Sequence, residues 1–376
     1  RSCDMKSNYR AFSELIEKVD ERNDDGAITE LIGVSIDKCF IKSVANTNGT
    51  DLSKYKIIRK NEFAVSLMQV SRDSKIPVAR LEDYEVAIMS PAYPIFRVKD
   101  TRKILPEYLD MWFKRPEFDR EAAFIAVGGV RGSMPWEEFV KMKLPVPTIE
   151  KQLEIVNSYK AITERIALKQ KINDNLLDSV QAIFRSWFVD YDPFDGVCPS
   201  NWETGCVEDI AEFFDSMRKP LSSLERTDME RIYPYYGAVS IVDYVDDYIF
   251  DGEYLLVSED GIYVVDENGH PLIQHISGKF WANNHAHILK GKSGFNEDSL
   301  YLFLANTNMA PIVTGAAQPK INQANLKSFP ITIPDSETML KFNNIIQPFF
   351  DQRLTNESEI KKLEALQSLL LTRLVD

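Results

Sequence analysis

The sequence predicts a mixed α+β fold in which two globular domains are joined and separated by two long antiparallel coiled-coil helices, as a pseudo-two-fold internal repeat. Three observations predict it. Residues 128–147 align with residues 315–334 at an offset of 187, and this offset continues without a gap to the C-terminus. Each copy ends in a long apolar heptad pattern, and strand-like runs precede both. The offset exceeds the period of solenoid repeats, which is roughly 20–50 residues.

The repeat divides the chain into four predicted segments. We expect a first globular domain over 1–147 and a second over 198–334. A long spacer helix with a Pro- and Gly-containing linker occupies 148–197, and a second spacer helix occupies 335–376. Each globular domain is therefore followed by a helix of its own.

The first domain combines short helical and strand-like runs. A helix is expected over 9–19, where apolar positions recur with helical spacing. Pro106 can occupy the first turn of a second helix over 106–113, because its missing N–H would have no partner there anyway. Strands are expected where apolar and β-branched residues cluster, over 29–36, 62–70, 86–90 and 94–98.

The first long helix is predicted over 150–188. Acidic residues in its first turn suit the helix dipole, and apolar residues recur in steps of three and four. Lys169 and Asn173 interrupt the apolar seam with polar side chains. A helix of this length would extend about 57 Å at 1.5 Å per residue, which is too long for the core of a small domain. The seam residues predicted to pack are Tyr159, Ile162, Ile166, Leu176, Ile183 and Trp187.

The second domain and its helix follow the same order. After a first element over 207–214, strands are expected over 254–258, 262–265, 285–290 and 331–333, and a helix over 298–305. The second long helix is predicted over 336–374, with Arg353 and Asn356 as polar breaks in its seam. We favour intramolecular antiparallel packing, in which the polar breaks set the register, over packing of each helix on a separate partner. The second set of packing residues is Ile346, Phe349, Ile360, Leu363 and Leu370.

Composition predicts a soluble, cytoplasmic protein. Hydrophobic residues make up 44% and charged residues 27% of the 376 residues, which is typical of a globular chain. We find no apolar run of about 18 residues that would span a membrane, and no signal peptide. Cys3, Cys39, Cys198 and Cys206 form no CxxC pair, so we expect reduced thiols rather than disulfides or a zinc site. The residues before Met5 are interpreted as a vector remnant.

The charge is negative but uneven. The net charge is −13, yet residues 1–147 hold 24 basic and 23 acidic side chains, whereas residues 198–334 hold 9 and 19. Non-specific nucleic-acid binding depends on phosphate neutralisation by Lys and Arg. Binding to DNA would therefore require local basic loops and partners that supply further positive charge.

Motifs of catalysis are absent from the sequence. It has no GxSxG elbow, no GxxxxGK[ST] phosphate loop and no HExxH. The Asn/Asp-Pro-Pro-aromatic tetrapeptide of amino-methyltransferases is also absent, because Asp192-Pro193 is followed by Phe194 and not by a second proline. His285 and His287 share a face of an expected strand, but no carboxylate or Cys lies at ligand spacing, so we predict no metal site. The chain is predicted to be non-catalytic and to hold no cofactor of its own.

Loops with basic, amide or aromatic side chains are the candidate DNA contacts. Arg pairs with guanine, Asn and Gln pair with adenine, and Lys or Ser can contact phosphates or bases. The alternative for any single residue is an ordinary solvated loop. Repetition favours recognition, since residues 318–320 align with residues 131–133 at the offset of 187. The candidates are Ser71, Arg72, Lys75, Arg131 and Ser133 in the first domain, and Arg218, Lys219, Tyr236, Asn283, Asn284, Gln318 and Lys320 in the second.

Several stretches, in their order and spacing, resemble the specificity subunits of type I restriction–modification systems over essentially the whole chain. The residues Ser216 and Met217 depart from the Gly-Lys turn that is usual before Arg218. The first domain matches less distinctively than the second. The stretches that carry the resemblance are 186–194 (SWFVDYDPF), 218–223 (RKPLSS), 233–238 (YPYYGA), 250–256 (FDGEYLL), 283–287 (NNHAH), 320–322 (KIN) and 329–334 (FPITIP).

The resemblance implies two target-recognition domains, each reading half of a bipartite, asymmetric site in double-stranded DNA, with the helices setting the spacing. It also implies two methyltransferase subunits as partners, with S-adenosylmethionine bound by the methyltransferase, and a restriction and translocase subunit for cleavage. The alternative from another functional class is a coiled-coil adaptor that binds protein without DNA specificity.

Overall fold

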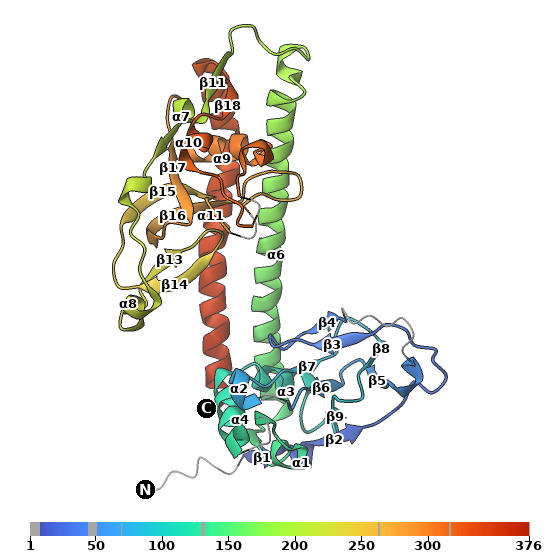
Figure 1. Ribbon diagram of the computed structural model, residues 1–376. Coiled ribbons are helices and arrows are strands. Elements are labelled where there is room, and N and C mark those ends of the chain that lie inside the picture. The colour runs from blue at the N-terminus through green and yellow to red at the C-terminus, as the bar shows by residue number, and fades with distance from the viewer. Residues whose placement is uncertain are drawn as a thin grey trace. The chain divides into compact units, whose positions relative to one another are not determined.

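A computed structural model describes residues 8–43, 51–68, 70–128, 132–261, 264–315 and 317–375 (Figure 1). Its contacts divide the chain into two units. Unit 1 comprises Arg1–Lys169 and Glu359–Asp376, and unit 2 comprises Gln170–Ser358. The fold is mixed helix and strand, as predicted. Within the described residues, none of the helices combines the length and apolar character that a membrane span requires.

Unit 1 combines short strands with several short helices. Its largest sheet has four strands in the order β2-β9-β6-β7, and two-stranded sheets join β1 to β10, β3 to β4, and β5 to β8. Its strands are β1 Tyr9–Ala11, β2 Ile16–Val19, β3 Ile32–Val34, β4 Phe40–Lys42, β5 Lys56–Arg59, β6 Phe63–Val65, β7 Val78–Arg80, β8 Val86–Met89, β9 Ile95–Val98 and β10 Lys143–Pro145. Its shorter helices are α1 Phe12–Leu15, α2 Val70–Asp73, α3 Pro106–Phe113, α4 Pro116–Ile125 and α5 Trp136–Phe139.

A cluster of phenylalanines forms the centre of the unit 1 core. Phe63 and Phe96 stack with ring centroids 5.1 Å apart, and Phe113 meets Phe63 edge-on at 5.7 Å. These side chains are fully buried. Leu371 and Leu374 from the chain end belong to the same core, so the last residues of the chain help to stabilise the first globular part.

The predicted helix over 9–19 is wrong. Only Phe12–Leu15 is helical, and strands β1 and β2 flank this single turn. Tyr9 pairs with Pro145 and Ile16 pairs with Val98, so pairing with distant strands overrides the local helical spacing. In contrast, the helix expected over 106–113 is confirmed as α3, with Pro106 in its first turn.

Unit 2 is built on a six-stranded sheet in the order β12-β17-β15-β16-β13-β14. The long antiparallel pair of β15 and β16 lies inside the sheet, and β14 lies at its edge. Separately, β11 pairs with β18. The strands are β11 Glu203–Cys206, β12 Ala211–Phe213, β13 Tyr233–Tyr236, β14 Ile241–Val245, β15 Phe250–Ser258, β16 Ile273–Ala282, β17 Ala286–Gly291 and β18 Pro330–Ile333, and the shorter helices are α7 Val207–Ile210, α8 Ser223–Thr227, α9 Glu297–Ala305 and α10 Gln323–Lys327.

Several strands of unit 2 extend or depart from the predictions. The strand expected over 254–258 is longer and begins at Phe250, and β13, β14 and β16 were not predicted. The first element over 207–214 is a helical turn, α7, followed by β12. Of the strand expected over 262–265, the first two residues lie outside the described residues, and Val265 forms only an isolated bridge with Pro271.

The two long helices are α6 Ile149–Phe188 and α11 Ser336–Thr372, and each contributes to both units (Figure 1). Within unit 1 their contacts run antiparallel. Gln367 donates a 2.8 Å hydrogen bond to Thr163, and Lys169 forms a 2.7 Å ion pair with Glu359. As residue numbers increase along α6, the numbers of the contacting residues on α11 decrease, as in an antiparallel pair.

The helices also run antiparallel within unit 2. The Phe342 ring lies 4.7 Å from the Phe188 ring, centroid to centroid, and Asn356 Nδ2 donates to Asn173 Oδ1 at 2.8 Å. Val180 and Phe184 on α6, with Ile346 on α11, join the main core of unit 2. The globular part of unit 2 is thus anchored on an apolar face that both helices form.

The internal repeat is visible in the order of elements before each long helix. In one copy α5, β10 and α6 begin at residues 136, 143 and 149, and in the other α10, β18 and α11 begin at residues 323, 330 and 336. Each start in the second set exceeds its counterpart by 187. The offset found in the sequence therefore relates equivalent structural elements.

Candidate nucleic-acid interface

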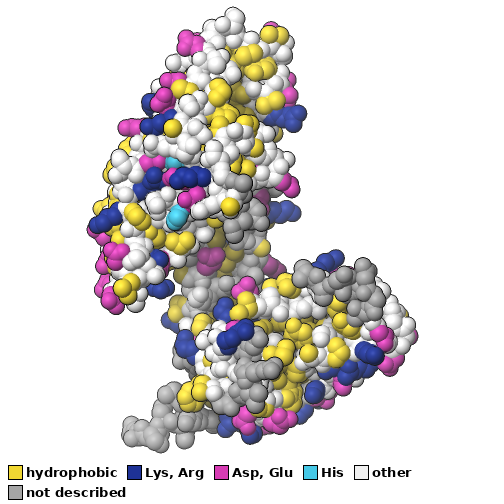
Figure 2. Space-filling view, viewed as in Figure 1, with side chains coloured by type: hydrophobic (Ala, Val, Ile, Leu, Met, Phe, Trp, Pro, Cys, Tyr) yellow, Lys and Arg dark blue, Asp and Glu magenta, His cyan; other side chains and the backbone are white. Residues whose placement is uncertain are grey.

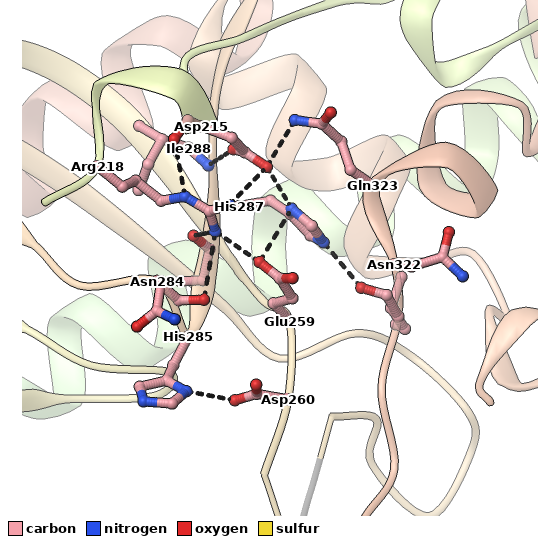
Figure 3. A network of polar contacts seen from close by, with 12 residues as sticks. Asp215, Arg218, Glu259, Asp260, Asn284, His285, His287, Ile288, Asn322 and Gln323 are labelled. Atoms are coloured by element: carbon pink, nitrogen blue, oxygen red, sulfur yellow. Dashed lines mark hydrogen bonds and ion pairs between the residues drawn. The ribbon is translucent and has the colours of Figure 1, made fainter. Parts of the chain in front are cut away.

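Three distant segments of unit 2 converge on the Glu259 side chain, and Figure 3 shows two of its partners, Arg218 and His287. Arg218 Nη1 lies 2.5 Å from Glu259 Oε2, and Lys320 Nζ lies 2.9 Å from Glu259 Oε1. His287 Nδ1 is 3.6 Å from the same carboxylate. Glu259 directly follows β15, so one residue at the end of a central strand joins loops that are far apart in the sequence. Figure 2 shows histidine, basic and acidic side chains gathered on this face of unit 2.

Ion pairs determine the charge state of Glu259. Burial acts to raise the pKa of Glu259, but its contacts with Arg218 and Lys320 outweigh burial and hold the pKa below its ordinary value. The carboxylate therefore stays ionised and keeps both cations in place. Removal of either cation would leave a buried negative charge with less compensation.

Arg218 is largely used within the protein. Besides Glu259, its guanidinium donates to the carbonyl oxygen of Ala286 at 2.7 Å, and its Nε donates to the carbonyl of Asp215 at 3.1 Å. Nη1 lies 3.5 Å from the carbonyl oxygen of Asn284. This geometry makes Arg218 a support for the 215–218 and 284–286 backbones. Its predicted contact with DNA stays a prediction.

Beside this network, Asp215 ties the 215–218 turn to β17 and α10. Its Oδ2 lies 2.6 Å from His287 Nδ1 and accepts a 2.7 Å hydrogen bond from Gln323, while its Oδ1 accepts from the backbone N–H of Ile288. His287 Nε2 donates to the carbonyl oxygen of Ile321 at 2.8 Å. Burial acts to raise the pKa of Asp215, but the hydrogen bond with His287 and the nearby positive charges lower it overall.

Asp215, Glu259 and His287 also form a group with metal-ligating chemistry, because their ligand atoms lie within 4.8 Å of one another. The sequence argument that His287 lacks a carboxylate partner is therefore wrong, since folding brings two carboxylates to it. Both carboxylates already contact the guanidinium of Arg218, and Lys320 contacts Glu259 as well. These side chains supply the positive charge that a metal ion would otherwise provide.

The turn before Lys320 docks in the same way as its counterpart in unit 1. Ile321 N–H donates to the carbonyl oxygen of Glu259 at 2.9 Å. At the equivalent position, 187 residues earlier, Met134 N–H donates to the carbonyl of Leu67 at 2.8 Å. Both acceptors follow strands, β15 and β6 respectively. The residues that follow the repeated glycine turns, Met134 and Ile321, therefore make equivalent backbone contacts in the two units.

In unit 1 the structure brings the predicted residues of two loops together. Ser71 and Arg72 lie in α2, and a Cβ on Gly132 would fall 2.4 Å from Ser71 Oγ and 3.4 Å from the Arg72 backbone nitrogen. Ser133 follows Gly132 directly. The Arg72 side chain is 63% exposed and forms a 2.7 Å ion pair with Asp73, and Lys75 Nζ lies 3.8 Å from Asp37. Arg131 lies outside the described residues.

The other predicted residues of unit 2 differ in exposure. Lys219, Asn284 and Gln318 are exposed and Lys320 is half-buried. Asn283 is buried, and its Oδ1 accepts from the backbone N–H of His285, so its oxygen shapes the turn. Tyr236 is half-buried, with its ring edge-on to Phe280 at 5.6 Å. Both residues were predicted as DNA contacts in loops, and that prediction is not tested by their partial or full burial.

The predicted helix-packing residues all lie on covered faces. Ile166, Ile346 and Ile360 are buried. The remaining eight are half-buried: Tyr159, Ile162, Leu176, Ile183, Trp187, Phe349, Leu363 and Leu370.

Sequence reasoning missed the acidic members of the network. Asp215 and Glu259 are 44 residues apart and belong to no recognised motif. The available signal was the Glu-Asp pair that follows the buried run of β15, because a charged pair at the end of a central strand indicates an edge where loops meet. Asp260 of that pair lies 2.6 Å from His285 Nδ1.

The region that contains this network matches a known protein family. Residues 199–366 match the family model of the type I restriction modification DNA specificity domain. A putative type I restriction enzyme specificity subunit of Haemophilus influenzae is 39% identical over 128 residues, which is 34% of this chain and 32% of that protein. The MjaIX specificity subunit of Methanocaldococcus jannaschii is 22% identical over 297 residues, which is 72% of this chain and 68% of that protein.

The fold agrees with a solved relative. The crystal structure of a type I restriction–modification S subunit from M. genitalium covers 97% of this chain, and this chain covers 95% of it, with a TM-score of 0.58 and 14% identity. That likeness extends over both units, whereas the family model covers the second half. Residues 199–366 therefore form a type I restriction modification DNA specificity domain, and the chain as a whole is similar to type I restriction–modification specificity subunits in sequence and in fold.

Proposed function

We propose that this chain is the sequence-specific DNA-recognition subunit of a type I restriction–modification complex. The observation that carries the proposal is the convergence of the predicted contact loops of unit 2 around Glu259, within the region that matches the DNA specificity domain. Exposed Lys219, Asn284 and Gln318 border this convergence and offer donors to phosphates and base edges. The supporting network holds the backbone of these loops, as preorganised recognition requires.

Each unit contributes a globular part with its own contact loops, and we propose that each reads one half of a bipartite, asymmetric site. The difference in charge between residues 1–147 and 198–334 supports different half-sites. The long helices, which continue from one unit into the other, would act as a coiled-coil spacer that sets the number of undefined bases between the halves.

The partners follow from the same proposal. Two methyltransferase subunits would dock on the helices and bind S-adenosylmethionine, and a restriction and translocase subunit would add cleavage. This chain would contribute no catalytic group. The net charge of −13 supports the dependence on partners, because they must supply much of the phosphate neutralisation. A cytoplasmic location would give the complex access to DNA.

The test is binding by the assembled complex with its methyltransferase subunits to a randomised library of duplexes. We expect enrichment of one bipartite motif with a fixed gap. Enrichment of no sequence would support the alternative of a coiled-coil adaptor and overturn the proposal. The isolated chain, given S-adenosylmethionine and the selected duplex, should neither methylate nor cleave it.

A further inference from the structure

The β13–β14 hairpin of unit 2 carries an uncharged, apolar tip. Residues 237–242 read Gly-Ala-Val-Ser-Ile-Val. Val239, Ile241 and Val242 are 51%, 41% and 55% exposed. Single exposed apolar side chains are ordinary, but three within four positions at a hairpin tip form a small apolar surface.

Hydrogen bonds hold this tip in one shape. Gln274 Nε2 donates to the carbonyl oxygens of Gly237 at 3.2 Å and Ala238 at 3.1 Å, and Gly237 N–H donates to the carbonyl of Ser240 at 2.8 Å. The side chain of Gln274 comes from β16, so the body of the sheet supports the tip. A fixed apolar surface loses little conformational freedom when it binds a ligand.

The tip lies next to amide groups of the candidate interface. The position that a Cβ on Gly237 would occupy is 2.8 Å from Val242 Cγ1 and 3.7 Å from Asn283 Nδ2, so a methyl group and an amide lie beside the same point. Asn283 N–H donates to the carbonyl of Tyr236 at 3.0 Å, which joins the hairpin to the 283–285 turn. The carbonyl oxygen of Asn284, in turn, lies 3.5 Å from Arg218. The apolar tip therefore continues the surface built around Glu259.

The acidic residue next to the tip is neutralised. Arg226 Nη1 lies 2.5 Å from Asp243 Oδ2, and Arg231 Nη2 lies 3.8 Å from Asp243 Oδ1. These ion pairs reduce the repulsion that a free carboxylate would exert on a polyanion. An uncharged tip beside amides and paired carboxylates is compatible with close approach to base edges.

In the major groove, an A·T pair presents the 5-methyl group of thymine beside the N6 and N7 atoms of adenine. Val or Ile can contact the methyl group, and an amide can pair with adenine. We infer, on the basis of the proposed function, that the 237–242 tip contacts thymine methyl groups in the half-site bound by unit 2, with Val242 and Val239 as the contacting side chains. Unit 2 then reads a half-site that contains A·T pairs.

The test uses the complex assembled with its methyltransferase subunits and the duplex selected from the library. Each thymine in both half-sites is replaced singly by deoxyuridine, which lacks only the 5-methyl group. We expect about a fourfold loss of affinity at one or more thymines of one half-site, the value for removal of one buried methyl group. Val242→Ala and Val239→Ala should abolish this loss in that half-site and leave the response of the other half-site unchanged.

A matched control is Val197→Ala, which shortens a 67% exposed valine in the linker and should retain the full response to deoxyuridine. Thermal unfolding of each variant shows whether it is folded, and either tip variant alone suffices for the test. A selected motif that binds deoxyuridine and thymine equally, or a methyl effect that persists in both tip variants, overturns the inference while the proposed function stands. Failure to select any motif overturns the proposed function instead.

Discussion

Asn356 donates a 2.8 Å hydrogen bond from Nδ2 to Oδ1 of Asn173, and both side chains are buried between the two long helices, with 2% and 9% exposure. The sequence identified both residues as breaks in apolar seams, and folding places them opposite each other. A buried polar pair is satisfied only in one register, because a slip would leave each amide facing apolar side chains.

We expect Asn356→Leu to lower the free energy of unfolding by about 2 kcal/mol, because Asn173 Oδ1 would lose this donor while it remains buried. The double variant Asn173→Leu, Asn356→Leu should recover most of this loss, since neither position then carries a polar group. Chemical denaturation of all four combinations measures the coupling. Additive losses from the two substitutions would contradict the prediction.

Arg218 and Lys219 are neighbours with different expected roles. Arg218→Ala should destabilise unit 2 by about 3 kcal/mol, because it leaves Glu259 and Asp215 short of a cation. Lys219→Ala should change stability by less than about 0.5 kcal/mol, because the side chain is exposed. It should nevertheless weaken DNA binding by the complex and reduce the slope of log K against log salt by about 1. Equal losses of stability in the two variants would show that the network does not support the loops.

Asp298 and His275 predict a pH-dependent stability of unit 2. Burial, with neighbouring carboxylates, raises the pKa of Asp298 to about 7, and burial lowers the pKa of His275 to about 4. The folded state thus keeps a proton on Asp298 that the unfolded chain loses above about pH 4, so this group's contribution to stability falls as pH rises from about 4 to 7. His275 acts in the opposite direction between about pH 4 and 6.5, where only the unfolded chain takes up its proton.

Asp298→Asn removes the first of these effects and leaves His275, whose Nδ1 lies 3.6 Å from Asp298 Oδ1, in place. We expect the variant to match the wild-type melting temperature below about pH 4, where Asp298 is neutral in both the folded and the unfolded protein. The variant should become progressively more stable than wild type as the pH increases, with a gap that levels off above about pH 8. Thermal unfolding from about pH 3.5 to about pH 9 measures the difference between the two proteins. A difference that does not change with pH would contradict a raised pKa.

Gly132 is required by both conformation and space. Its φ is +74°, and a Cβ would lie 2.4 Å from Ser71 Oγ, so Gly132→Ala should cost about 1–2 kcal/mol and move Ser71. Gly26→Ala is the matched control, since Gly26 has a φ of +66° with nothing within 4 Å of a Cβ. The loss of stability in Gly26→Ala should reflect backbone strain alone. Adding Ser71→Ala to Gly132→Ala should restore the part of the loss that is due to the clash.

Helix length should set the spacing of the half-sites. Deleting one heptad from α6 and the facing heptad from α11 keeps the apolar seam in phase and shortens each helix by about 10 Å. At about 3.4 Å per base pair, the undefined gap should shrink by about three base pairs. Library selection with the altered complex measures the gap, and a variant with seven substituted surface residues serves as the length control. An unchanged gap would refute the spacer role.

Local patterns were sufficient for the long helices α6 and α11 and for α3, whereas α4 Pro116–Ile125 was not predicted. The apolar periodicity of α6 and α11 and the Pro-initiated start of α3 depend on residues that are close together in the chain. The sequence alone therefore contains the information that is needed to predict these helices. The strands were harder to predict from the sequence. β16 contains Ser277-Gly278-Lys279 and has no clear alternation, and it is a strand because all of its first eight residues pair with β15. The 9–19 segment shows the converse, where helical spacing was present but distant pairing partners prevailed.

By itself the sequence determined the duplication at an offset of 187, the two long helices with their polar breaks, and the loops that carry exposed basic and amide groups. Only the tertiary structure decided which of those groups are free. It buried Asn283, bound Arg218 to Glu259 and Asp215, and left Lys219 and Asn284 exposed. The physical reason is that a charge or amide takes its role from partners within a few ångströms, and residues 41 or 72 positions apart, such as Arg218 with Glu259 and Asp215 with His287, become partners only through folding.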